Sequence, residues 1–251
     1  MSKLSVVIIT KNEERNIADC LATVEWADEI IIVDSFSTDR TVEIAKKYTD
    51  KIFQRQFTNY SDQKNFGAAQ ASNPWILSID ADERVSSELK EEICQVITKG
   101  SSDGYLIPCL DYMFGKKIKY GGWYPQYHLR LYKKDKGKWV RAVHEFVTVD
   151  GKIEYLKNPL LHFSHLTISN FIQKLDRYTS MEAENLFLQQ KKTNIFNIIF
   201  LPLIVFIYKY LFCLGFLDGV HGLFLAVSLA YYHFAKHTKL WELWFKNHAN
   251  K

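Results

Sequence analysis

The stretch "ILSIDADERV", residues 76–85, carries an apolar run directly into three carboxylates within four positions. Asp80 and Asp82 flank an alanine, and Glu83 follows at once. Because like charges this close repel one another, the cluster must face either open solvent or a positive group. The apolar run that leads into it, "WILSIDA" at 75–81, is typical of a buried strand, so the sequence places the cluster at a strand end.

Two further β-branched runs precede this stretch, "LSVVIIT" at 4–10 and "EIIIVDS" at 29–35. Helical patterns lie between and after the three runs, over about 13–24, 38–48, 61–71 and 86–100. Apolar strands that alternate with helices predict an α/β fold with a mostly parallel, doubly wound sheet flanked by helices.

In such sheets ligands gather at the carboxyl ends of the strands, and Asn12, Asp34, Asp80 and Asp82 each follow a predicted strand end. The Asp80-Ala-Asp82 sequence suits a divalent cation such as Mn²⁺ or Mg²⁺, since these ions prefer carboxylate oxygens. An EF-hand is excluded because Arg84 stands where its loop needs another side-chain oxygen. A D-x-D sequence alone is a weak signal, and a solvated acidic turn is the alternative.

The sequence changes character after residue 100, where "GYLIP", "HLRLYKK" and "EFVTV" predict strands and residues from about 167 to 192 predict a helix. An almost wholly apolar segment, 195–217, and a second apolar helical pattern complete the chain. The expected divisions are an α/β domain, 1–165, whose halves meet near residue 100, and a helical region, 166–251, with a hairpin at 195–235.

Composition narrows the possible classes of protein. The 251 residues are 47% hydrophobic, enough for a sizeable core, and the net charge of +4 gives no support for nucleic-acid binding. The four cysteines show no CxxC spacing, so we expect reduced thiols, no zinc site and a cytoplasmic protein. Met1 leads almost directly into the run at 4–10, so no signal peptide is expected.

Four separated motifs favour a metal site over the solvated turn. They occur in the order "VIITKNEERNI", "IIIVDSFSTDRTVEIA", "QKNFGAAQAS" and "WILSIDADERV". Together they resemble the family 2 glycosyltransferases, inverting enzymes with the GT-A fold, over residues 4 to about 165. The resemblance implies that 1–165 is a catalytic domain, with a nucleotide-sugar half at about 1–100 and an acceptor half at 101–165. The resemblance implies that the nucleotide base and ribose are held by Thr10, Asn12, Glu13 and Asp34. It also implies that Lys64 lies near the ribose or diphosphate, that Asp80 lies near the ribose, and that Asp82 ligates the Mn²⁺ or Mg²⁺ ion.

Inverting transfer also needs a base, because an acceptor hydroxyl must lose its proton as it attacks the sugar. Glu145, in "RAVHEF", stands about where the family places that base; a surface glutamate on an edge strand is the alternative. GT-A enzymes often add a histidine to the metal site, and His162 is the candidate, with His165 as the fallback. A packed core histidine is the alternative. For His144, a phosphate-orienting role and simple packing are equally open.

Four aromatic residues in the second half of the sequence have two equally open roles. They form a platform for sugar rings, or they pack in the second layer of the fold. They are Tyr120, Trp123, Tyr124 and Tyr127. In "GFLDG" a contact with an acceptor lipid and a helix-turn role are both open for Gly215, Asp218 and Gly219.

The apolar segment 195–217 is long enough to cross a bilayer, although Pro202 and Lys209 are awkward inside one. The lysine- and tryptophan-rich end that follows the second helical pattern, "AKHTKLWELWFK", favours instead a peripheral or monotopic hairpin at the inner face of the cytoplasmic membrane. A true span and a buried helical pair are the alternatives.

The motifs "VHE" and "GFLDG" narrow the resemblance to the bacterial lipopolysaccharide-core β-1,4-glucosyltransferase group. That resemblance implies transfer of glucose from UDP-glucose to a lipid-linked glycan, the inner core of lipopolysaccharide. Two rival functions remain. A sugar nucleotidyltransferase would need a glycine-rich loop where "TKNEERN" stands. A non-enzymatic membrane-surface scaffold on a transferase fold is opposed by the intact carboxylates.

Overall fold

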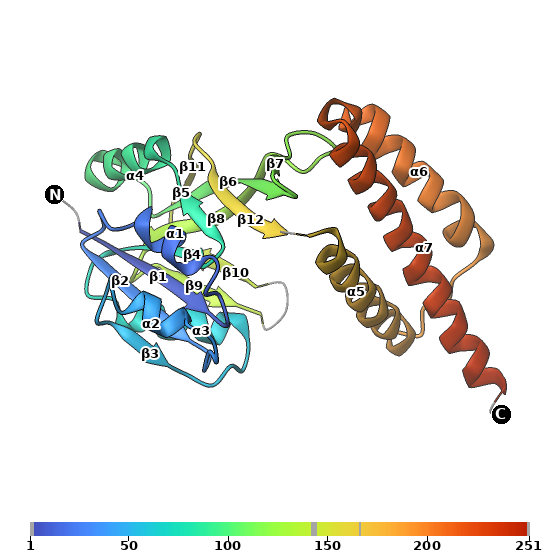
Figure 1. Ribbon diagram of the computed structural model, residues 1–251, viewed down its shortest axis with the longest axis horizontal. Helices are drawn as coiled ribbons and strands as arrows, with labels where there is room; N and C mark the ends of the chain where they lie inside the picture. Colours follow the sequence, from blue (N-terminus) through green and yellow to red (C-terminus); the bar gives the residue numbers. More distant parts are fainter. Residues whose placement is uncertain (1–2, 142–144, 166, 250–251) are drawn as a thin grey trace. The chain divides into compact units, whose positions relative to one another are not determined.

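The apolar runs of the first eighty residues form the parallel half of a curled sheet. Strands β1 (Leu4–Thr10), β2 (Glu29–Asp34) and β4 (Trp75–Asp80) lie in the order β2-β1-β4, and the short β3 (Ile52–Gln54) pairs with the outer edge of β2. The computed structural model describes residues 3–141, 145–165 and 167–249 (Figure 1). The predicted α/β fold is confirmed, and β3 makes the strand that ends in Asp80 the fourth along the chain instead of the third.

The sheet continues beyond β4 with antiparallel strands, in the order β4-β8-β6-β12-β5. β11 pairs with β6 in parallel and β7 pairs with it antiparallel, while β9 and β10 form a separate hairpin. The strands are β5 (Glu83–Val85), β6 (Gly104–Met113), β7 (Lys116–Lys117), β8 (Gln126–Lys133), β9 (Gly137–Val140), β10 (Phe146–Val149), β11 (Ile153–Tyr155) and β12 (Leu160–His165).

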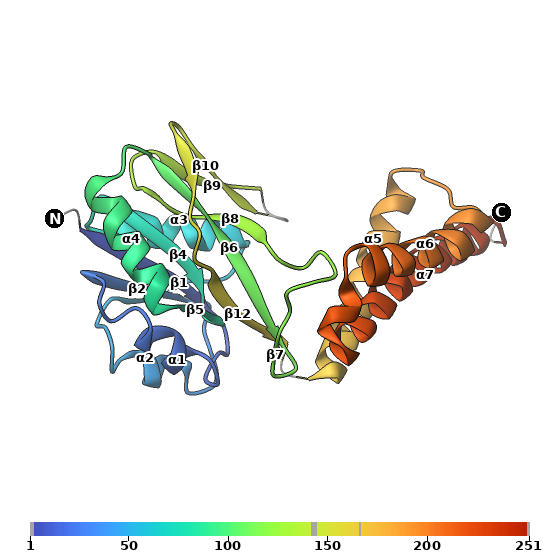
Figure 2. The same cartoon turned by 90° about the horizontal axis from the view of Figure 1, so that it is seen from above.

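Helices cover both faces of the sheet. On one side lie α1 (Ile17–Ala22), α2 (Thr41–Ala45) and α4 (Ser87–Lys99); on the other lie α3 (Tyr60–Gln70) and the β9–β10 hairpin (Figure 2). The start of α4 is fixed locally, because Ser86 accepts a hydrogen bond from the Leu89 amide at 3.2 Å.

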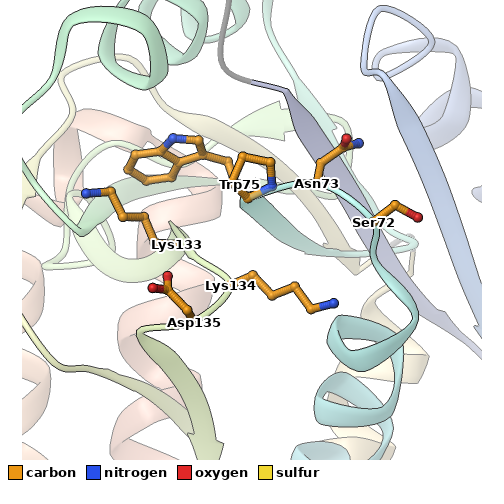
Figure 3. A pocket seen from close by; sticks show the side chains of 7 residues that line it. Ser72, Asn73, Trp75, Lys133, Lys134 and Asp135 are labelled. Atoms are coloured by element: carbon orange, nitrogen blue, oxygen red, sulfur yellow. The ribbon is translucent and has the colours of Figure 1, made fainter.

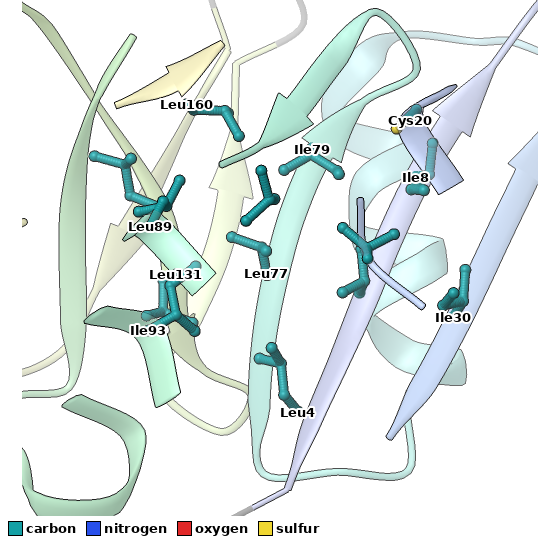
Figure 4. Close-up of a cluster of buried hydrophobic side chains, with 14 of the residues drawn as sticks. Leu4, Ile8, Cys20, Ile30, Leu77, Ile79, Leu89, Ile93, Leu131 and Leu160 are labelled. Carbon is teal, nitrogen blue, oxygen red and sulfur yellow. The ribbon is translucent and has the colours of Figure 1, made fainter. Parts of the chain in front are cut away.

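The main core fills the face that α1 and α4 cover. Side chains of β1, β4 and β8 meet those of the two helices there, and they include Leu4, Ile8, Cys20, Leu77, Ile79, Leu89, Ile93 and Leu131 (Figure 4). On the opposite face Gly67 lets α3 approach β1 closely, since an added Cβ would lie 2.4 Å from Val7 Cγ1. Helix and sheet layers thus hold the carboxyl ends of β1, β2 and β4 together at one edge.

The chain forms two compact units, of which the first is Met1–Leu110 with Gln126–Phe163. It holds the sheet's parallel half and is called here the sheet unit. The second, the helical unit, is Asp111–Pro125 with Ser164–Lys251. The expected division near residue 165 remains a prediction.

In the helical unit α5 (Ile168–Leu188) and α6 (Leu201–Ile207) both lie along α7 (Val220–Ala249) (Figure 1). Polar bonds join α5 to α7, where Lys239 Nζ donates to Asp176 Oδ1 at 2.6 Å and to Thr179 Oγ1 at 2.9 Å.

The segment 195–217 consists of consecutive short helical elements with different hydrogen-bond patterns. The π-helical turns η1 (Phe196–Phe200) and η2 (Tyr208–Phe212) flank α6, and the 3₁₀ turn η3 (Gly215–Asp218) follows. Over the described part of the chain, no helix combines the length and the apolar content that crossing a bilayer requires. Asp218 is buried and accepts hydrogen bonds from the amides of Lys119 and Tyr120, so its carboxylate holds the helical unit together.

Candidate active site

Two positively charged side chains of the protein lie between the crowded carboxylates. Arg130 donates to Asp80 Oδ2 at 2.9 Å and to Glu83 Oε1 at 2.7 Å. Lys64 Nζ lies 3.2 Å from Asp80 Oδ1 and 3.2 Å from Glu145 Oε1. The protein's own cations therefore balance Asp80, Glu83 and Glu145, three acids that the sequence leaves unpaired.

Arg130 reaches this cluster from a β-bulge. Along the β8–β6 pair, Leu131 is opposite Tyr105 and Leu129 is opposite Leu106, so Arg130 is the extra residue between them. A bulge re-aims the side chain that it carries and occurs often beside active sites. Sequence reasoning missed Arg130; the available signal was an arginine between two leucines in "HLRLYKK", where a strand side chain is expected to be buried.

Glu83 is buried in the cluster, whereas a solvated acidic turn would leave it exposed. It is 1% exposed, and its Oε2 accepts the Asp80 amide at 2.8 Å, which closes the turn between β4 and β5. Burial raises the pKa of Glu83 to about 7 against the attraction of Arg130. Burial opposes ionisation of Asp80 as well, but Lys64 and Arg130 hold the pKa of that carboxyl well below its usual range.

Lys64 is buried and contacts an aromatic ring as well as two carboxylates. Its side chain is 2% exposed, and its ammonium group lies 4.4 Å from the centre of the Trp139 ring. α3 carries Lys64, and Glu145 directly precedes β10, so the ion pair joins segments 81 residues apart. Glu145 remains 20% exposed, which leaves its carboxylate accessible to a substrate.

Asp82 and His162 form a second pair at the same edge. β12 pairs antiparallel with β5, which sets His162 opposite Glu83 and brings its Nε2 to 3.3 Å from Asp82 Oδ2. Two ligands about 2.1 Å from one octahedral ion lie about 3 Å apart, so this spacing fits a shared divalent cation. Carboxylate oxygen and imidazole nitrogen are both suited to Mn²⁺. The predicted ligand set is compatible with this geometry and stays a prediction.

Of the four residues predicted to hold the nucleoside, Thr10 and Asp34 end β1 and β2, and Asn12 and Glu13 lie on the loop after β1. Thr10 Oγ1 is 3.4 Å from Asp34 Oδ1, and the buried Asp34 also accepts the Ser37 amide at 2.9 Å. Asn12 has a positive φ of 55° and its side chain accepts the Thr38 amide at 2.8 Å. These bonds tie the two loops to each other.

Glu13 lies within the electrostatic influence of the acidic turn. Its amide donates to Thr41 Oγ1 at 2.8 Å, and its carboxylate accepts from Asn16 Nδ2 at 2.8 Å. Burial raises the pKa of Glu13, and the nearby charges of Asp82 and Asp80 add to that effect. A raised pKa beside other carboxylates is typical of a binding site for a cation or a hydrogen-bond donor.

The predicted aromatic residues are divided between the two units. Trp123 packs into the core of the helical unit beside Ile118 and Leu225. Tyr120 and Tyr124 belong to the same unit, whereas Tyr127 belongs to the sheet unit and its ring lies 4.9 Å from that of Tyr155. His144 and the His165 side chain lie outside the described residues.

A surface hollow of the sheet unit lies away from the charged cluster. It is lined by Ser72, Asn73, Pro74, Trp75, Lys133, Lys134 and Asp135 (Figure 3). Trp75 begins β4, whereas Asp80 ends it, so the hollow lies at the other end of the strand from the charged cluster. Lys133 there is paired with Asp103 at 2.8 Å, and we assign no role to the hollow.

Comparison with known proteins gives consistent results. Residues 5–150 match the model of glycosyl transferase family 2. An uncharacterized glycosyltransferase of Rickettsia typhi is 32% identical, over 98% of this chain and 89% of its own length. The lipopolysaccharide core biosynthesis glycosyltransferase LpsC of Rhizobium meliloti is 29% identical, over 95% and 92%. Among solved structures, Staphylococcus aureus TarS 1–349 in complex with UDP-GlcNAc shares 18% identity over 95% of this chain and 89% of that one, with a TM-score of 0.48.

Proposed function

This chain belongs to glycosyl transferase family 2, and from that premise we propose that it is a metal-dependent inverting glycosyltransferase acting on a lipid-linked glycan. The observation that carries the proposal is the pairing of two sites at one sheet edge. Asp82 and His162 lie 3.3 Å apart, as two ligands of one cation would, and Glu145 is held by Lys64 with its carboxylate partly exposed.

In the proposed reaction the acceptor hydroxyl oxygen attacks the anomeric carbon of the donor sugar. The new carbon–oxygen bond forms as the bond to the nucleoside diphosphate breaks, and the hydroxyl proton passes to Glu145. A positioned base of this kind contributes roughly 10²–10⁴-fold to the rate. Lys64 orients Glu145 through the 3.2 Å contact and keeps Asp80 beside it.

Mn²⁺ or Mg²⁺ is the proposed cofactor, held by Asp82 and His162. When bound, such a cation offsets the negative charge that develops on the leaving diphosphate. Thr10, Asn12, Glu13 and Asp34 are the proposed nucleoside contacts.

The proposed donor is UDP-glucose and the proposed acceptor is the inner core of lipopolysaccharide. The motifs "VHE" and "GFLDG" support this choice, as does the similarity to LpsC, whose name assigns it to lipopolysaccharide core biosynthesis.

The test is transfer of labelled glucose from UDP-glucose to purified heptose-terminated lipopolysaccharide core with Mn²⁺ present. We expect a β-glucoside from the α-configured donor, identified by NMR of the released glycan. Glu145→Gln should keep UDP affinity within about twofold while turnover falls at least 100-fold. A product with retained configuration, or normal turnover by E145Q, would overturn the proposed mechanism.

A membrane surface is the proposed location of the acceptor. Large apolar side chains recur every three or four residues along η1, α6 and η2, with exposures from 45% at Ile207 to 74% at Phe212. They are Phe196, Ile199, Phe200, Leu203, Ile204, Ile207, Tyr208, Leu211 and Phe212. An exposed apolar stripe of this length is rare on monomeric soluble proteins. Exposed Lys191 and Lys192 precede it and suit anionic headgroups on the cytoplasmic face.

Flotation with lipid vesicles tests this part separately. Wild type should float with phosphatidylglycerol-containing vesicles and less with pure phosphatidylcholine. The double variant Phe200→Glu and Phe212→Glu should stay at the bottom, whereas Phe57→Glu, which changes a 44% exposed ring of the sheet unit, should float normally. Equal flotation of all three proteins would show that the apolar stripe does not bind the membrane.

A further inference from the structure

Phe36 occupies an unfavourable backbone position at the candidate active site. It lies two residues after the end of β2, its φ is 58°, and its side chain is 47% exposed. A left-handed conformation costs free energy for any residue with a Cβ, and glycine adopts it readily. The backbone at Phe36 is therefore strained, and burial of the ring does not offset that cost.

Neighbouring side chains impose this conformation. Lys11 Nζ donates to the Ser35 carbonyl at 2.6 Å and to the Phe36 carbonyl at 2.5 Å. On the other side of Phe36, the Ser37 amide donates to Asp34 Oδ2 at 2.9 Å. Strained residues that their surroundings hold in place are concentrated at ligand sites, so Phe36 is a candidate for ligand contact.

The order of the strands fixes what part of a ligand would meet the ring. The proposed metal ligand Asp82 follows β4, and Phe36 follows β2, with β1 between them. Neighbouring strands are about 4.8 Å apart, so the two loops are separated by about 10 Å along the sheet edge. That distance is comparable with the reach from the diphosphate of an extended nucleotide, across its ribose, to its base.

We propose that the Phe36 ring is the surface against which the nucleobase of the donor stacks. The inference rests on the proposed function, since it assumes a nucleotide donor whose diphosphate lies at Asp82. Stacking on an aromatic ring suits every base, because each presents a π face. Phe36 therefore contributes affinity for the base, and the choice among bases falls to the polar groups of the same two loops. Lys11 is a positioning residue that holds the loop of Phe36.

Titration calorimetry with two probes tests the inference. UDP carries a base and inorganic pyrophosphate does not; each is titrated with Mg²⁺ into wild type, Phe36→Asn, Phe36→Gly and Phe36→Trp. Asparagine and glycine tolerate the positive φ but lack the ring. We expect F36N and F36G to bind UDP roughly 5- to 150-fold more weakly, and to bind pyrophosphate as wild type does. F36W should keep UDP affinity within about threefold.

Thermal melting provides the control for folding. F36N and F36G should melt at or above the wild-type temperature, because they relieve the strain at this position. Loss of affinity together with equal or greater stability separates a ligand contact from a structural role. Wild-type UDP affinity in F36N, or equal losses for UDP and pyrophosphate, would overturn the inference while leaving the proposed function intact. Failure of wild type to bind UDP with Mg²⁺ would overturn the donor site and the inference together.

Discussion

Replacing Arg130 by methionine should destabilise the sheet unit in a pH-dependent way. The guanidinium group makes charge-assisted hydrogen bonds to Asp80 at 2.9 Å and to Glu83 at 2.7 Å. Methionine fills a similar volume but leaves both carboxylates without this cation. Removing one partner of a buried ion pair costs about 3–5 kcal/mol, because the remaining charge has lost its compensation.

The pH dependence follows from Glu83, whose pKa is about 7 with Arg130 present. Arg130 attracts the ionised form, so the pKa of Glu83 must be higher still in Arg130→Met. Below pH 7 both proteins hold a protonated Glu83, and the loss of stability in the variant comes mainly from Asp80. Above pH 7 the ionised Glu83–Arg130 pair stabilises wild type, and the variant lacks this pair. The destabilisation should therefore grow by up to about 1.4 kcal/mol for each pH unit above 7.

Urea unfolding followed by circular dichroism at pH 6 and pH 8 measures this effect. Glu83→Gln is the matched control, and in its background Arg130→Met should cost less and lose most of its dependence on pH. The difference between the two backgrounds should be about 1–3 kcal/mol at pH 8. A cost below 1 kcal/mol, or one that is the same at both pH values and in both backgrounds, would refute the proposed charge network.

Three further results are expected. Gly67→Ala should destabilise the protein by about 1–3 kcal/mol in urea unfolding, because the new Cβ would lie 2.4 Å from Val7 Cγ1; shortening Val7 to alanine in that variant should restore part of the loss. Glu29 has a pKa of about 2, since hydrogen bonds from Lys51, Ser5 and Ser72 outweigh its burial. Its contribution should be complete above pH 4.5 and fade as the pH falls toward 2, so the stability of wild type and Glu29→Gln should converge in acid. His162→Ala should weaken UDP binding in Mn²⁺ and leave it unchanged in EDTA; equal loss in both buffers would argue against a metal ligand.

The parallel half of the sheet could be predicted because its strands are buried on both faces. The runs at 4–10, 29–35 and 75–81 therefore read as continuous apolar stretches, and the structure has β1, β2 and β4 within one residue of those bounds. β3, β5, β7 and β11 have two or three residues each, too few to show a period, and pairing with longer strands defines them.

For the charged cluster, the sequence predicted acidic residues but not the cations that pair with them. Sequence spacing placed Asp80 and Asp82 at a strand end, but their partners come from distant segments. Arg130 is 47 residues from Glu83, and Lys64 is 81 residues from Glu145. The Arg130 contact also depends on a bulge in the β8–β6 pair, which local propensity does not encode.

The central claim is that the carboxyl edge of the sheet binds a nucleotide through a divalent cation, and calorimetric titration of UDP tests it most directly. Wild type and Asp82→Asn are each titrated in Mn²⁺ and in EDTA. The account predicts that wild type binds UDP at least tenfold more tightly in Mn²⁺ than in EDTA, and that D82N binds weakly in both. No binding by wild type in Mn²⁺, or equal metal-dependent binding by D82N, would contradict it.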